Sequence, residues 1–76
     1  MVMLDRIEKA ILAAHAAGNG QAMAELYAEA AQHMLSNGQI ERGCFYLTQG
    51  YVFALEEGLA SASGIHARLV ELGHEI

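Results

Sequence analysis

Three glycine-containing breaks, spaced about one helix length apart, constrain this chain more than any other feature of its sequence. They read GNG at residues 18–20, SNG at 36–38 and EEGLAS around Gly58. Glycine is typical of helix ends and turns, while proline is absent and alanine is abundant. We therefore expect an all-α fold of four antiparallel helices in a single domain. Short connections arrange them as two helix-turn-helix hairpins, at residues 2–36 and 39–73.

Apolar residues recur at the spacing of one helix face within each stretch between the breaks. The expected helices span residues 2–17, 21–35, 39–57 and 60–72. Asn19 and Ser61 are expected to cap the second and fourth helices, and Gly73 to end the fourth. The residues expected on the inner faces of the first, second and fourth helices are Leu4, Ile7, Ile11, Ala14, Met23, Leu26, Tyr27, Ala30, Met34, Ala62, Ile65, Leu69 and Leu72.

The third stretch combines most of the aromatic residues with a glycine in the middle of a helix. Gly50 costs about 1 kcal/mol relative to alanine in a helix interior. We interpret it as the point where a neighbouring backbone passes, with Tyr46 and Phe53 on either side. A helix that is apolar on most sides is expected to have neighbours on more than one flank. The remaining apolar residues form two further stripes, Cys44, Leu47, Tyr51 and Leu55 on one and Phe45 and Val52 on the other.

The second hairpin resembles the tetratricopeptide repeat, a helix–turn–helix unit of about 34 residues that stacks into solenoids. Tyr46 matches a large residue of the repeat's first helix, Gly50 a small one, Phe53 an aromatic one, and Ala62 the small residue of the second helix. The sequence departs from the repeat at His66 and Leu69, and no proline closes the unit. In the first hairpin only Tyr27 and Ala30 fit well. The resemblance implies a binding scaffold whose groove accepts a peptide or helix of a partner protein.

The charge and the cysteine content indicate which partners are not expected and in which compartment the protein works. The net charge is −5, and the four basic residues are scattered singly, so nucleic acid is not an expected ligand. The apolar run around Gly50 is too short to cross a bilayer, and a membrane is not an expected partner. Cys44 is the single cysteine, which excludes an internal disulfide and fits a reducing compartment. We expect a cytoplasmic protein.

Catalytic and cofactor-binding residues are not expected, because no nucleophile–base pairing or phosphate-binding glycine loop can be recognised. The histidines suggest one alternative function, the binding of a metal ion. Glu71 and His74 have the Glu-x-x-His spacing of carboxylate metal sites in helical bundles, and Glu29 and His33 lie one helical turn apart. The alternative function is therefore a helical-bundle metal-binding protein that uses both pairs across a dimer. The simpler interpretation places these side chains in solvent at helix ends.

Apolar residues make up 54% of a chain that is too short to bury them all. A contiguous exposed apolar patch marks an interaction site. We expect a small non-enzymatic interaction module, of the adaptor, chaperone-like or assembly type, that binds another protein or a second copy of itself as a homodimer. The residues expected to form the groove and patch are Tyr27, Tyr46, Gly50 and Phe53, with Leu12 and Tyr51 in an intermolecular patch.

Overall fold

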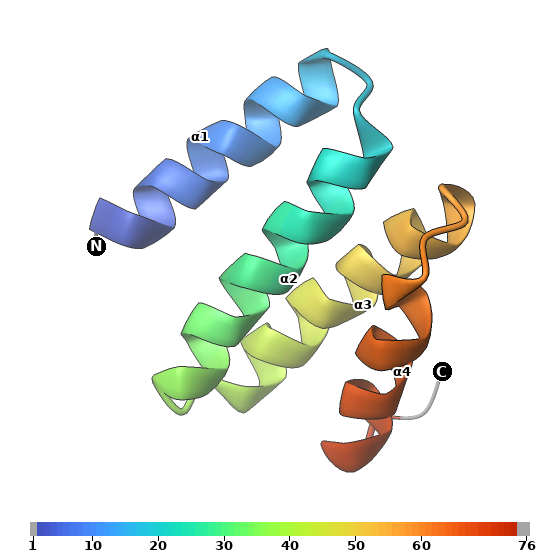
Figure 1. The fold of residues 1–76 in the computed structure, drawn as a ribbon. Helices are drawn as coiled ribbons and strands as arrows, with labels where there is room; N and C mark the ends of the chain where they lie inside the picture. The colour runs from blue at the N-terminus through green and yellow to red at the C-terminus, as the bar shows by residue number, and fades with distance from the viewer. Residues whose placement is uncertain (1, 75–76) are drawn as a thin grey trace.

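A computed structural model describes residues 2–74, with side chains from Asp5 onward, and these residues form four α-helices without a strand. The helices are α1 (Val2–Ala16), α2 (Gly20–Ser36), α3 (Ile40–Glu56) and α4 (Ser61–Glu71). Each differs from the expected span by no more than one residue at either end. The all-α prediction with four antiparallel helices is confirmed, and consecutive helices reverse direction across short turns (Figure 1). None of these four helices is both long and apolar enough to cross a bilayer.

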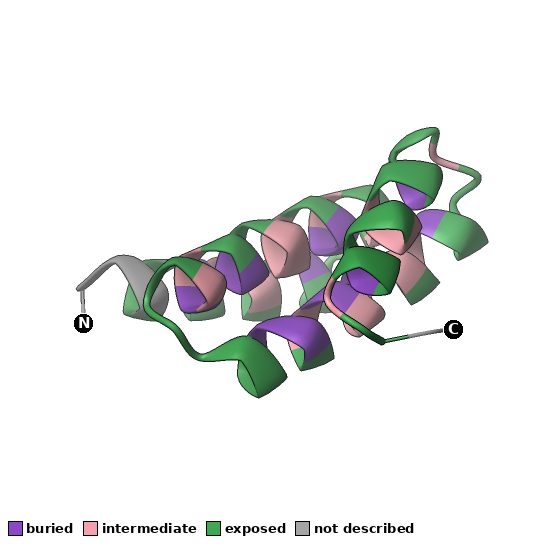
Figure 2. Ribbon diagram, turned by 90° about the horizontal axis from the view of Figure 1, so that it is seen from below, coloured by how far each residue is buried: buried purple, intermediate pink, exposed green. Residues whose placement is uncertain are grey.

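The helices follow one another in a row and do not close into a bundle. Extensive contacts join α1 to α2, α2 to α3, and α3 to α4, and the contact between α2 and α3 is the largest. The Cα atoms extend over 32 Å by 31 Å but only 13 Å in the third direction. Buried residues lie on the facing sides of the helices, while the outer sides are exposed (Figure 2). The two hairpins are therefore joined to each other more extensively than either is joined within itself.

All four helices end in a turn of the same type. Glycines 18, 38, 58 and 73 have φ values of +67°, +78°, +66° and +85°. The residue after each glycine donates its backbone N–H to a carbonyl five residues earlier, as in the bond of 2.9 Å from Gln39 to Met34. This pattern is the Schellman motif, which satisfies carbonyls that the helix leaves unpaired. The carbonyls that accept these bonds belong to buried residues, namely Ala14, Met34, Ala54 and Leu69.

Two glycine-to-alanine changes, one in this motif and one inside a helix, should have opposite effects on stability. No atom would lie within 4 Å of a Cβ at Gly38 or at Gly64, so neither change causes a clash. Gly38→Ala forces a left-handed conformation on alanine and should lower the free energy of unfolding by about 1 kcal/mol. Gly64→Ala lies inside α4 and should raise it by about 1 kcal/mol. Urea titration of both variants measures the difference, and equal effects would contradict the assigned backbone conformations.

Part of the core forms two clusters of buried residues around α3. One contains the buried residues Ala31, Cys44, Leu47 and Leu69, and the other contains Ala24, Ala54 and Ala62. Small residues dominate where α2 meets α3, which lets these two helices approach closely. The inner-face residues expected from the sequence are buried or half-buried, except Leu4, whose side chain lies outside the described residues.

The structure corrects three of the local predictions. Leu55 does not continue the buried stripe of α3, because 55% of its surface is exposed. Phe45 and Val52 are also exposed, because α2 and α4 both pack against one half of α3 and leave the other half open. Ser61 does not cap α4, which has Ala60 at its N-cap and no side-chain cap. Asn19 does cap α2, since its side-chain oxygen accepts a hydrogen bond of 3.1 Å from the Ala22 N–H.

Candidate functional site

Three aromatic rings from α2 and α3 stack over Gly50. The Tyr27 ring lies between Tyr46 and Phe53, at a centroid distance of 5.8 Å from each. A Cβ on Gly50 would lie 3.3 Å from the Ala24 carbonyl oxygen and 3.5 Å from the Tyr27 Cβ. The backbone of α2 therefore passes directly against Gly50, which confirms the role that the sequence predicts for this glycine. We call Tyr27, Tyr46 and Phe53 the ring stack.

A depression between α1 and α3 opens beside the ring stack. It has a volume of about 320 Å³ and is lined by Glu8, Ile11 and Leu12 of α1, Tyr27 of α2 and Tyr46 of α3. We call it the ring groove. Leu12 is 70% exposed, so the α1 wall of the groove presents a large apolar side chain to solvent. The groove brings together three residues that the sequence nominates for partner binding, Leu12, Tyr27 and Tyr46.

Gly50 and Phe53 support the groove without lining it. Gly50 is buried where the backbone of α2 passes α3, while Phe53 is half-buried and stacks on the Tyr27 ring. Both residues fix the position of Tyr27, which has an aromatic neighbour on each face. The groove wall formed by Tyr27 and Tyr46 is therefore held in place by packing before any ligand binds.

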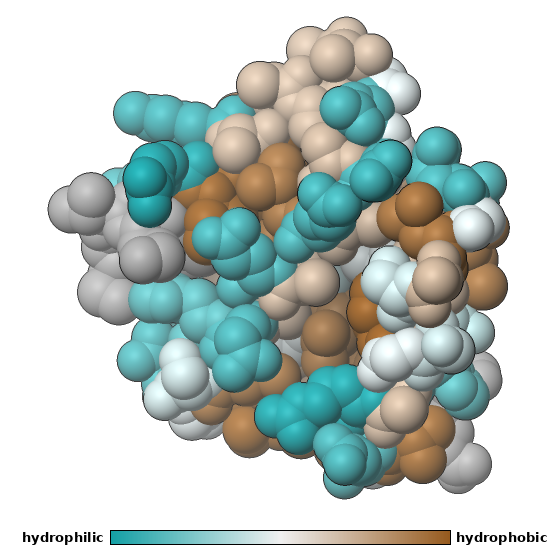
Figure 3. All heavy atoms as spheres, viewed as in Figure 1, coloured by the Kyte–Doolittle hydropathy of each residue, from teal (hydrophilic) through white to brown (hydrophobic). Residues whose placement is uncertain are grey.

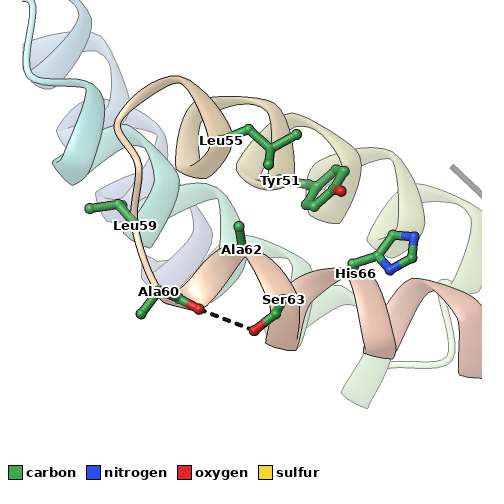
Figure 4. A pocket seen from close by; sticks show the side chains of 7 residues that line it. All are labelled: Tyr51, Leu55, Leu59, Ala60, Ala62, Ser63 and His66. Carbon is green, nitrogen blue, oxygen red and sulfur yellow. Dashed lines mark hydrogen bonds between the residues drawn. The ribbon is translucent and has the colours of Figure 1, made fainter.

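Tyr51 lies in a different place from the other nominated residues. It stacks on His66 of α4 with a centroid distance of 5.4 Å. The two rings line a second depression, between α3 and α4, of about 460 Å³ (Figure 4). The same view shows the bond from the Ser63 hydroxyl to the Ala60 carbonyl oxygen at the base of α4. Tyr51 and Leu12 therefore do not belong to one patch. His66 is half-buried.

The two candidate metal-binding pairs lie on separate segments: Glu29 and His33 are on α2, whereas Glu71 ends α4 and His74 follows the turn after it. Glu71 forms an ion pair of 3.1 Å with Arg68 within α4. His33 Nε2 lies 3.4 Å from the Asn37 side-chain nitrogen, at the end of α2. Among the described residues, no three histidine, cysteine or acidic side chains gather at one point. The pairs Glu71/His74 and Glu29/His33 remain a prediction that only an assembly of two copies would complete.

Glu56 and Glu57, at the end of α3, have different surroundings. The Glu57 carboxylate lies against Gly20, the first residue of α2, so a Cβ on Gly20 would collide with it. Because α2 and α3 are antiparallel, the end of α3 meets the start of α2, where the helix dipole favours negative charge. Glu56, the last residue of α3, has no such helix end beside it among the described contacts and remains exposed.

Neither a family model, nor a curated protein, nor a solved structure matches this chain.

Apolar exposure extends beyond the residues that the sequence nominates. The large hydrophobic residues with high exposure are Leu12, Ile40, Phe45, Val52, Leu55 and Val70. In Figure 3 apolar side chains reach the surface at several separate places among the hydrophilic ones. Phe45 and Val52 share a side of α3 because they are seven residues apart, but this spacing does not indicate whether another helix covers that side.

Proposed function

We propose that this protein is a small non-enzymatic interaction module whose ring groove binds a segment of a protein partner. The observation that carries the proposal is the preformed, half-buried aromatic wall of Tyr27 and Tyr46, which lines one groove with the exposed Leu12. Apolar grooves of this kind accept the apolar face of an amphipathic helix. The resemblance of the second hairpin to tetratricopeptide repeats, on Tyr46, Gly50 and Phe53, supports the same function.

The chemistry of the groove favours a basic amphipathic segment. Glu8 is exposed at the groove, and the chain carries a net charge of −5. A segment with two or three apolar residues at helical spacing and a lysine or arginine near them would complement both features. The function is that of an adaptor or assembly subunit that also associates with itself, and we place it in the cytoplasm. A buried, unpaired Cys44 thiol supports this compartment.

The groove is tested by comparing two substitutions of exposed apolar residues. A displayed library of random peptides is selected on the wild-type protein, and the affinities of the selected peptides are measured by titration calorimetry. Leu12→Glu places a carboxylate in the groove and should weaken binding at least tenfold. Val70→Glu is the matched control, because Val70 is 49% exposed on α4 and does not line the groove.

The selected peptides should carry apolar residues three or four positions apart, with basic residues beside them. Circular dichroism should show unchanged helix content in both variants, since neither side chain is buried. Equal binding of the peptides to the Leu12→Glu and wild-type proteins would show that the ring groove is not the binding site.

A further inference from the structure

The outer half of α3 carries three parallel columns of residues, which are exposed except for the half-buried Thr48 and Gln49. Residues seven positions apart lie almost above one another on a helix, so each column follows the helix axis. The central column is Phe45 and Val52, which are 59% and 43% exposed. The column on the ring-groove side is Arg42, Gln49 and Glu56, and the column on the other side is Glu41, Thr48 and Leu55.

We propose that a second copy of this chain docks on this face, with the two α3 helices antiparallel and a two-fold axis between Thr48 and Gln49. This inference rests on the proposed function and names one partner and its geometry. In an antiparallel pair related by a two-fold axis, each flanking column packs against the same column of the partner, which runs in the opposite direction. Phe45 then packs on the partner's Val52, and Arg42 faces the partner's Glu56.

The two ends of α3 supply the charge complementarity that this arrangement needs. Arg42 and Glu56 are 14 residues apart, which is about 21 Å along the helix. Both are exposed, and they lie on the same side of the exposed central column. In antiparallel docking, Arg42 of each copy faces the partner's Glu56, so one ion pair forms at each end of the contact. Parallel docking would instead exchange the flanking columns, so that Arg42 faces the partner's Glu41 and Glu56 faces the partner's Leu55 without an ion pair.

The placement of these charges is unfavourable for an isolated helix. Arg42 lies in the first turn of α3 and Glu56 is its last residue. The helix dipole favours the reverse arrangement, with acidic residues in the first turn and basic residues in the last. Glu57 is accounted for by the start of α2, whereas Glu56 has no such compensation. Pairing with a second copy would compensate both Arg42 and Glu56.

The centre of the contact can be covered without leaving polar groups unpaired. The Thr48 hydroxyl donates a hydrogen bond of 2.9 Å to the Cys44 carbonyl oxygen within α3. It therefore needs no further acceptor when the partner covers it. Gln49 faces its own copy across the two-fold axis, and two side-chain amides can bond to each other. Glu41 lies at the outer end of its column, where its carboxylate stays in solvent.

A charge-reversal cycle on full-length protein, followed by sedimentation equilibrium, tests the inference. The wild type should sediment as a reversible dimer. Arg42→Glu and Glu56→Arg should each raise the dimer Kd about tenfold, because each acts at both symmetry-related pairs. The double variant should return Kd to within about threefold of the wild type. Controls are Arg6→Glu and Asp5→Arg, which make the same changes in net charge at exposed positions of α1, a helix whose extensive contact is with α2.

The thermal stability of the monomer shows whether Arg42 and Glu56 act in the dimer contact or stabilise the fold of the monomer. Each charge reversal places a charge where the helix dipole favours it. The melting temperature, measured at a protein concentration below the dimer Kd, should therefore stay the same or rise. If Arg42 or Glu56 stabilised the fold instead, the melting temperature would fall.

A wild type that remains monomeric up to millimolar concentration would overturn the inference and leave the peptide-binding test of the ring groove unaffected. A dimer that is insensitive to both reversals, or that the double variant does not restore, would overturn it as well.

Discussion

Gly50→Leu should destabilise the fold by about 3 kcal/mol, a large part of the stability of a 76-residue domain. The first carbon of any side chain at this position already meets the Ala24 carbonyl oxygen and the Ala28 nitrogen. These are backbone atoms of a helix and cannot turn aside as a side chain can. The three further carbons of leucine must therefore push α2 away from α3, at the most extensive contact of the fold.

Thermal and urea denaturation measure this loss, with an expected fall in melting temperature of about 15 °C. Gly50→Ala is the graded control. Its single Cβ at 3.3 Å from the carbonyl oxygen is tight, but alanine regains about 1 kcal/mol of helix propensity, so the net change should be small. A Gly50→Leu protein that melts with the wild type would show that α2 does not pass against this position.

Leu69→Ala should have an effect of similar size by the opposite mechanism, the creation of a cavity. Leu69 is fully buried, and together with Ala62 it forms the buried face of α4. Truncating a buried leucine to alanine costs about 2–5 kcal/mol. Since α4 has its one extensive contact with α3, we expect the variant to release α4 before the rest of the protein unfolds.

Amide hydrogen exchange of the variant checks this order. Protection should fall in α4 and persist at the contact between α2 and α3. Val70→Ala is the matched control, because it removes apolar carbons from the next residue of the same helix at an exposed position. Its stability should stay within about 0.5 kcal/mol of the wild type. Uniform loss of protection across all helices in Leu69→Ala would contradict the release of α4 alone.

Features set by local chemistry could be predicted from the sequence. The helix ends follow from glycines at 18, 38, 58 and 73, each of which adopts a positive φ after a helix. The close approach at Gly50 agrees with the interpretation of a helix-interior glycine between Tyr46 and Phe53 as the point where a backbone passes. The Tyr27 ring of α2 stacks on both of those rings.

Features set by the number and direction of neighbouring helices could not be predicted. The periodicity of α3 indicates apolar residues on several sides but does not say which sides a helix covers. Both neighbours lie on one half of α3, so Phe45, Val52 and Leu55 are exposed. For the same reason, Tyr51 packs on His66 and lies apart from Leu12. The contact between Glu57 and Gly20 joins residues 37 positions apart, and no local pattern reveals it.

The arrangement of the helices in a row has a consequence for the rate of folding. Every extensive contact joins helices that follow each other directly in the chain. No long loop has to close before a stabilising contact forms, so the relative contact order is low. Helical proteins of low contact order fold in microseconds to milliseconds. We therefore expect this chain to leave little time for aggregation through Phe45, Val52 and its other exposed apolar side chains while it folds.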